Sequence, residues 1–226
     1  MTDKAENSPL SLKQIKLMRS ATYASIALAL TLISLKIWAW SMTDSVAILS
    51  SLVDSLLDLI ASIITFYAVR VAVSPADAEH RFGHGKSEGV SGLLQGFIIT
   101  ISTLYVASEA VIRLLEPRSI SEPEVGFGVM SISLALTVLL VGFQRFVVAR
   151  TGSLAISADA MHYKADLLTN LAVLCAIFFS YRFEWNVLDP LLGLLIAGFI
   201  FLGVRRIVLD AIDVLLDREL PEKDRQ

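Results

Sequence analysis

Two pairs of potential metal ligands stand out in this sequence, each with its members four residues apart. The first pair is Asp54 and Asp58 in the run DSLLD, and the second is His162 and Asp166 in the run HYKAD. Residues four apart project from one face of an α-helix, so each helix would present two donor groups on a single stripe. Three carboxylates and one imidazole form a tetrahedral set suited to a divalent metal such as Zn²⁺.

Both pairs lie in long apolar segments, where ionisable side chains are costly and are functional by default. The alternative is that they form ordinary hydrogen bonds or ion pairs between helices. Three acids against one histidine would then leave an unbalanced negative charge, which a bound cation neutralises economically. We therefore favour a metal or proton function for these residues.

The composition of the chain is that of a membrane protein. Its 226 residues are 55% hydrophobic and 18% charged, with a mean hydropathy of +0.67, whereas soluble domains carry about 25% charged residues. The net charge of −3 gives no reason to expect a nucleic acid partner. A single cysteine, Cys175, excludes a disulfide framework.

Six segments are long and apolar enough to cross a bilayer, which takes roughly 20 residues. They are residues 18–40, 46–73, 89–115, 125–148, 153–181 and 187–209. The predicted fold class is an all-α integral membrane protein with six transmembrane helices. A soluble bundle of six apolar helices is the alternative, and the length of the segments disfavours it.

The distribution of Lys and Arg predicts the orientation of the chain. Fourteen of the 19 lie at the two termini or in the second-to-third and fourth-to-fifth connections, and only three lie on the opposite side. Positively charged loops stay in the cytoplasm, so both termini are expected there, in a multi-pass protein of the inner (plasma) membrane. We expect residues 1–14 to be a cytoplasmic tail, 15–218 the six-helix transmembrane domain, and 219–226 the start of a second cytoplasmic tail.

The two halves of the chain resemble each other weakly. Residues 43–59 align with 151–167 at a constant offset of 108, with six identities in 17 positions, and Asp54 then falls opposite His162. Three spans separate the two segments, and an odd number inserts them in opposite senses. This favours a 3+3 inverted repeat with its site near the middle of the membrane.

Four motifs together resemble those of the cation diffusion facilitators, in particular the bacterial zinc and ferrous-iron efflux transporters. The motifs are DSLLD, PADAEHRFGHGKSE, HYKAD and LLDREL. The resemblance implies that Asp54, Asp58, His162 and Asp166 bind the transported metal. It also implies a homodimer that exchanges divalent metal for protons by alternating access.

The resemblance assigns two further groups of residues. Asp77, His80 and His84 would form a secondary metal site in a cytoplasmic loop, although their spacing alone fits a solvated loop equally well. Lys86 and Asp217 would form a charge interlock that helps hold the dimer, although they could be ordinary surface charges. Family members normally continue into a cytoplasmic ferredoxin-like domain, whereas this sequence ends at Gln226. Either it is a naturally short member without that domain, or it is part of a longer chain.

Asp159 lies three residues before His162 and therefore on the same helix face. We expect it to line a cytoplasmic cavity and attract cations, or to contact Lys164 or Arg150 through water.

The predicted function is secondary active efflux of a divalent cation from the cytoplasm in exchange for protons, and not an enzymatic reaction. Zn²⁺ is the first candidate, with Cd²⁺, Fe²⁺ and Mn²⁺ behind it. A divalent-cation or proton channel is one alternative, but four ligands would bind an ion too tightly for fast conduction. An intramembrane metallohydrolase is another, but the sequence has no HExxH motif and a catalytic zinc keeps one position open.

Overall fold

A computed structural model describes residues 10–43, 46–115, 124–183 and 188–218, and these contain six helices and no strand. The helices are α1 (Leu12–Thr43), α2 (Val46–Ala72), α3 (Lys86–Leu115), α4 (Glu124–Thr151), α5 (Leu154–Phe183) and α6 (Leu188–Leu215). All six expected spans are confirmed as helices. The first begins earlier and the last ends later than its apolar segment, because a helix continues past the lipid as long as its backbone stays paired. Residues 12–14, expected as part of a tail, are therefore helical.

Short-range contacts explain where several helices begin and end. Ser11 and Gln14 form a reciprocal capping box at the start of α1, with each side chain bonded to the other's backbone N–H. Gly152 follows α4 with a φ of 66°, a left-handed conformation that glycine adopts without strain and that ends the helix. At the start of α5, Glu88 of α3 accepts hydrogen bonds from the Ser153 hydroxyl and the Ala155 backbone N–H. The N-terminus of α5 is therefore capped from a neighbouring helix.

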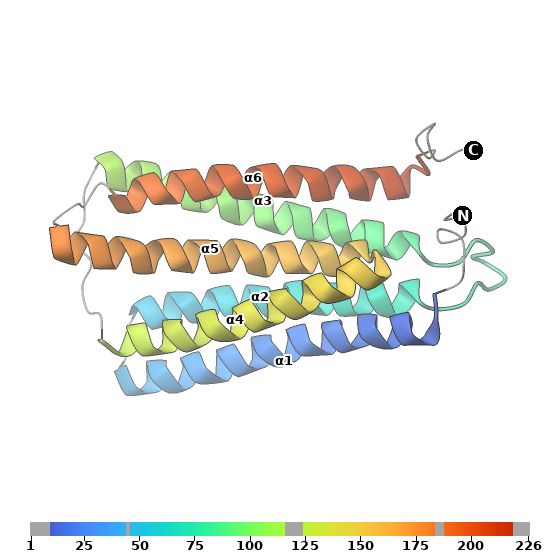
Figure 1. Cartoon of the computed structure of the whole chain (residues 1–226), viewed down its shortest axis with the longest axis horizontal. Helices are drawn as coiled ribbons and strands as arrows, with labels where there is room; N and C mark the ends of the chain where they lie inside the picture. The colour runs from blue at the N-terminus through green and yellow to red at the C-terminus, as the bar shows by residue number, and fades with distance from the viewer. Residues whose placement is uncertain (1–9, 44–45, 116–123, 184–187, 219–226) are drawn as a thin grey trace.

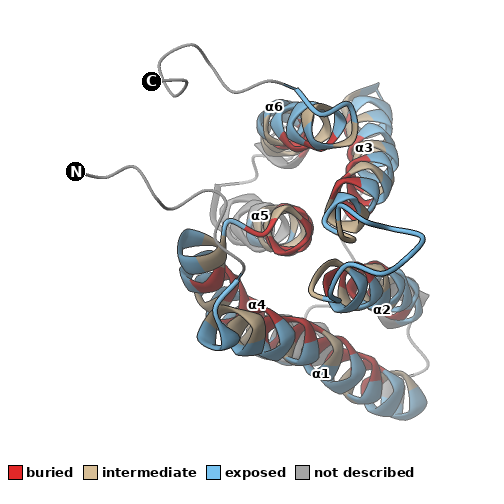
Figure 2. Ribbon diagram, turned by 90° about the vertical axis from the view of Figure 1, so that its right-hand side faces the viewer, coloured by how far each residue is buried: buried red, intermediate tan, exposed pale blue. Residues whose placement is uncertain are grey.

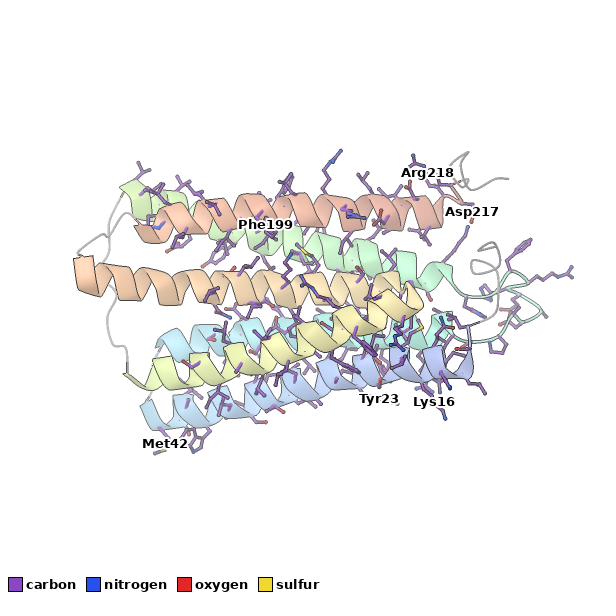
Figure 3. All side chains as sticks on the ribbon, viewed as in Figure 1. Lys16, Tyr23, Met42, Phe199, Asp217 and Arg218 are labelled. Carbon is purple, nitrogen blue, oxygen red and sulfur yellow. The ribbon has the colours of Figure 1, made fainter. Side chains whose placement is uncertain are left out.

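The helices run up and down in turn, so α1 begins at the same end of the bundle where α6 finishes (Figure 1). The connection between α2 and α3, residues 73–85, lies at this end too. Figure 3 shows Lys16 and Asp217 near it, whereas Met42 lies at the opposite end of α1. This arrangement agrees with an even number of membrane crossings.

The outer surface of the bundle is apolar and suited to lipid. Leu139 and Leu202 are 70% and 68% exposed, and many other large apolar side chains face outward with them. Among the described residues, five helices are long and apolar enough to cross a membrane: all except α5. Such an exposed apolar surface would be unfavourable in water and is stabilised in a bilayer.

α5 is the central helix of the bundle. It packs against all five of the others, and it lies between the α3–α6 pair and the layer of α1, α2 and α4 (Figure 2). Its first half carries Asp159, His162, Lys164 and Asp166. A helix surrounded by other helices can carry such ionisable side chains without exposing them to lipid.

α3 and α6 pack closely because α3 presents glycines to its partner. A Cβ added at Gly96 would lie 2.5 Å from Val208 Cγ2, and one added at Gly92 would lie 3.1 Å from Ala211 Cβ. Small residues allow helix backbones to approach in this way when lipid surrounds them.

Each helix of the first half packs against the helix three places later along the chain. α1 packs on α4, α2 on α5 and α3 on α6, so each helix of the first half contacts its counterpart in the second. The repeat itself stays a prediction.

Candidate metal site

The first cluster of potential ligands joins α2 to α5. Asp58, His162 and Asp166 each offer one ligand atom, and these atoms lie within 4.8 Å of one another. Asp58 projects from the middle of α2, and His162 and Asp166 project from successive turns of α5. The i, i+4 spacing of the sequence therefore brings both α5 ligands to the face that meets α2.

The imidazole of His162 lies between the two carboxylates. Its Nε2 atom is 3.0 Å from Asp58 Oδ1 and 3.7 Å from Asp166 Oδ2. The side chain of His162 is only 5% exposed. Asp166 Oδ2 is buried and accepts no hydrogen bond from the part of the chain that the structure describes. This oxygen is therefore an open acceptor inside the cluster, able to take a proton, a water molecule or a cation.

Asp54, the fourth expected ligand, lies outside this compact group. It is one turn before Asp58 on α2, and more than a third of the residue is exposed. It interacts electrostatically with Asp58 and with Lys36 of α1. The structure therefore brings three of the four expected ligands together and leaves Asp54 beside them.

The second cluster lies in the connection between α2 and α3. Asp77, His80 and His84 also offer ligand atoms within 4.8 Å of one another. Asp77 Oδ1 is 3.3 Å from His80 Nδ1, and Asp77 Oδ2 is 3.4 Å from His84 Nε2. The Nδ1 atom of His84 is buried and has no hydrogen-bond partner among the described residues.

The backbone of this loop holds Asp77 in place. The Asp77 carboxylate accepts hydrogen bonds from the backbone N–H groups of His80, at 2.6 Å, and Glu79, at 3.0 Å. These bonds, that from His80 first, lower the pKa of the Asp77 carboxyl. Asp77 is therefore anionic at neutral pH and available to a cation.

Lys86 and Asp217, the expected interlock, form an ion pair within one chain. Lys86 Nζ lies 2.7 Å from Asp217 Oδ2 and also donates to the Leu215 carbonyl at 3.3 Å. The pair ties the start of α3 to the end of α6. Both side chains are more than half exposed, so the pair contributes at most about 1 kcal/mol to stability.

Asp159 does not line a cavity, and that expectation is wrong. The residue is completely buried. Its Oδ2 atom accepts hydrogen bonds of 2.7 Å from Ser25 of α1 and from Gln144 of α4, and its Oδ1 atom accepts a longer one of 3.4 Å from Gln95 of α3. Asp159 thus fastens the central helix to three others.

Lys164 makes a different contact from the one expected. Its Nζ atom lies 4.7 Å from the centre of the Phe199 ring of α6, which Figure 3 labels. A cation over an aromatic face is a favourable contact within a helix bundle.

The contacts of Lys36 were not predicted from the sequence. This lysine is only 9% exposed, and its ammonium group donates to the Ser51 carbonyl at 2.9 Å and to the Ser55 hydroxyl at 2.6 Å. The signal in the sequence was a lone lysine inside the apolar run LISLKIWAW.

An all-helical, lipid-facing bundle with a buried acidic and histidine cluster between two helices defines a class, the membrane transporters of metal cations. Comparison with known proteins agrees, because residues 22–216 match the cation efflux transmembrane domain. The chain is 42% identical over 211 residues to the cation-efflux pump FieF of Salmonella arizonae and 43% identical to that of Pectobacterium carotovorum. Each alignment covers 93% of this chain and 70% of the relative.

The chain belongs to the cation efflux family, the cation diffusion facilitators that its motifs resemble. It is accordingly a multi-pass protein of the inner membrane and a transporter of divalent cations. Its relatives are named as pumps, which are transporters rather than enzymes.

Proposed function

We propose that this protein exports Zn²⁺ from the cytoplasm in exchange for protons, with Asp54, Asp58, His162 and Asp166 as the ligands of the transported ion. The observation that supports the proposal most strongly is the buried cluster of Asp58, His162 and Asp166. A mixed nitrogen and oxygen set suits Zn²⁺, and Cd²⁺, Fe²⁺ and Mn²⁺ are further candidates.

The position of His162 supports proton exchange. The Nε2 atom that faces both carboxylates has one lone pair, which can hold either a proton or a metal ion. Metal binding therefore has to displace the proton from this nitrogen, and protonation has to release the metal. The Nε2 atom of His162 therefore couples the outward flux of metal to the inward flux of protons.

Asp54 completes the set through a small movement. It lies one turn from Asp58 on α2, so a shift of α2 against α5 brings its carboxylate to the other three ligands. Zn²⁺ must lose its water to cross the membrane, and a site that closes around it and then opens to the opposite side provides alternating access.

The test is metal uptake into proteoliposomes that contain the purified protein. We expect saturable Zn²⁺ uptake that a proton gradient accelerates, and its loss in Asp58→Ala. Asp210→Ala, which removes an exposed carboxylate on α6, is the matched control and should transport normally.

Uptake in Asp58→Ala equal to that of the wild type would refute the site. Uptake that ignores the proton gradient would refute the exchange, and flux that does not saturate would favour a channel.

We also propose that Asp77, His80 and His84 form a secondary metal site at the cytoplasmic surface. The support is their compact arrangement around an anionic Asp77 and the unpaired Nδ1 atom of His84. Equilibrium binding should then show a second metal per chain. Asp77→Ala should remove that metal while Asp58→Ala leaves it in place.

Finally, we propose that the protein works as a homodimer in which the pair of Lys86 and Asp217 positions the interface. The support is the bond that this pair makes between α3 and the end of α6. We also propose residues 15–218 as the transport unit, with both termini in the cytoplasm.

A further inference from the structure

Lys36 is a buried cation beside the candidate metal site. It lies on α1, and its ammonium group reaches across to α2, where Ser51 and Ser55 accept its hydrogen bonds. Ser55 directly follows Asp54 and is itself fully buried. The lysine is therefore held at one place, close to the helix that supplies two of the ligands.

The charges around Lys36 are those of the metal site. The ammonium group interacts electrostatically with Asp58, Asp54 and Asp166, the three carboxylates of the proposed ligand set. Burial disfavours the charged form of this amine, whereas the three carboxylates favour it. The two hydrogen bonds replace part of the hydration that the ammonium group loses.

We propose that Lys36 is a fixed counter-charge that sets the metal site to accept one divalent cation. Three ionised carboxylates carry three negative charges, and Lys36 cancels one of them. The remaining two match the charge of a single divalent ion, since a neutral imidazole adds none. Lys36 lowers the affinity for the ion by repulsion and thereby keeps the site from holding its cargo too tightly to release it.

This proposal rests on the proposed function, because it assumes that the ligand set binds metal. A counter-charge and a purely structural lysine predict opposite changes in metal affinity when Lys36 is replaced. Removal of a structural lysine would displace α2 and weaken metal binding, whereas removal of a repelling charge strengthens it.

The test compares Lys36→Met, which keeps the length and removes the charge, with Lys36→Arg, which keeps the charge. Zn²⁺ affinity is measured by isothermal titration calorimetry in the background of Asp77→Ala, His80→Ala and His84→Ala, so that only the buried site binds. Every variant is measured at the same neutral pH, at which the guanidinium of Lys36→Arg keeps its charge. We expect the Zn²⁺ affinity of Lys36→Met to be higher than that of the wild type by roughly tenfold or more. Lys36→Arg should keep the wild-type affinity.

Competition between Tb³⁺ and Zn²⁺ for the buried site gives a second measurement, the ratio of the two affinities. A repelling charge acts in proportion to the charge of the bound ion, so loss of Lys36 should favour Tb³⁺ more than it favours Zn²⁺. Lys36→Gln, which keeps a donor for Ser55, replaces Lys36→Met if the latter does not fold.

Unchanged or weaker Zn²⁺ binding in the uncharged variants would overturn the role of Lys36. Absence of Zn²⁺ binding in the parent protein, or binding that survives Asp58→Ala, would instead overturn the metal site itself. The two failures are therefore distinguishable.

Discussion

His162 is the residue that we expect to give the proposed site a preference for a borderline metal. It is the one nitrogen ligand in a set otherwise made of carboxylates, and its Nε2 atom is 3.0 Å from Asp58. Oxygen ligands favour harder ions such as Mn²⁺, whereas imidazole favours Zn²⁺.

We therefore predict that His162→Asp shifts the selectivity toward Mn²⁺. The ratio of Mn²⁺ to Zn²⁺ uptake in a competition assay should rise by roughly tenfold, equivalent to about 1.4 kcal/mol. His80→Asp makes the same replacement in the loop cluster and should leave the ratio unchanged. An unaltered ratio in His162→Asp would mean that the imidazole does not contact the ion.

Asp159 links α5 to three neighbouring helices. It accepts hydrogen bonds from α1, α3 and α4 in a fully buried position. Without the carboxylate, Ser25 can still donate to the Ala21 carbonyl and accept from Gln144. One N–H of Gln144 loses its acceptor, and such a buried unpaired group costs about 1–3 kcal/mol.

Asp159→Ala should accordingly lower the midpoint of thermal unfolding in detergent by several degrees. Asp210→Ala removes an exposed carboxylate and serves as the control, with no expected change. Equal midpoints for the two variants would show that the network adds no stability.

The contact between α3 and α6 depends on the absence of a side chain at Gly96. An added Cβ would meet Val208, a branched side chain that cannot move away easily. Gly96→Ala should therefore destabilise the protein by about 1–3 kcal/mol through overpacking.

Gly142→Ala is the matched control, because an added Cβ meets nothing within 4 Å there. It should leave stability unchanged or raise it by up to about 1 kcal/mol, the helix propensity difference. Thermal unfolding of the two variants side by side measures both effects. A Gly96→Ala variant as stable as Gly142→Ala would contradict the close packing.

The complete transporter is proposed to be a dimer, and the pair of Lys86 and Asp217 tests this. Lys86→Glu places two negative charges together and should release the end of α6 from α3. Light scattering in detergent should then show a shift from dimer toward monomer, with the dimer restored by adding Asp217→Lys. A wild-type protein that is monomeric would contradict the proposal, and so would a single variant that stays dimeric.

The sequence predicted the helices well because the lipid imposes length and apolarity on each span. It also predicted which face carries Asp58, His162 and Asp166, since i, i+4 spacing is a local property. It did not predict the contacts of Lys36 or Asp159. Their partners come from other helices, such as Gln95, which is 64 positions from Asp159, and the rotation of each helix about its axis decides which of them meet.

The most direct test of the whole account is X-ray absorption spectroscopy at the zinc edge, on protein whose loop cluster is removed by Asp77→Ala, His80→Ala and His84→Ala. We predict one Zn²⁺ per chain with four ligands at about 2.0 Å, of which one is an imidazole that disappears in His162→Ala. A six-coordinate, fully hydrated ion, or an imidazole signal that persists without His162, would contradict the central claim that α2 and α5 together enclose a dehydrated metal.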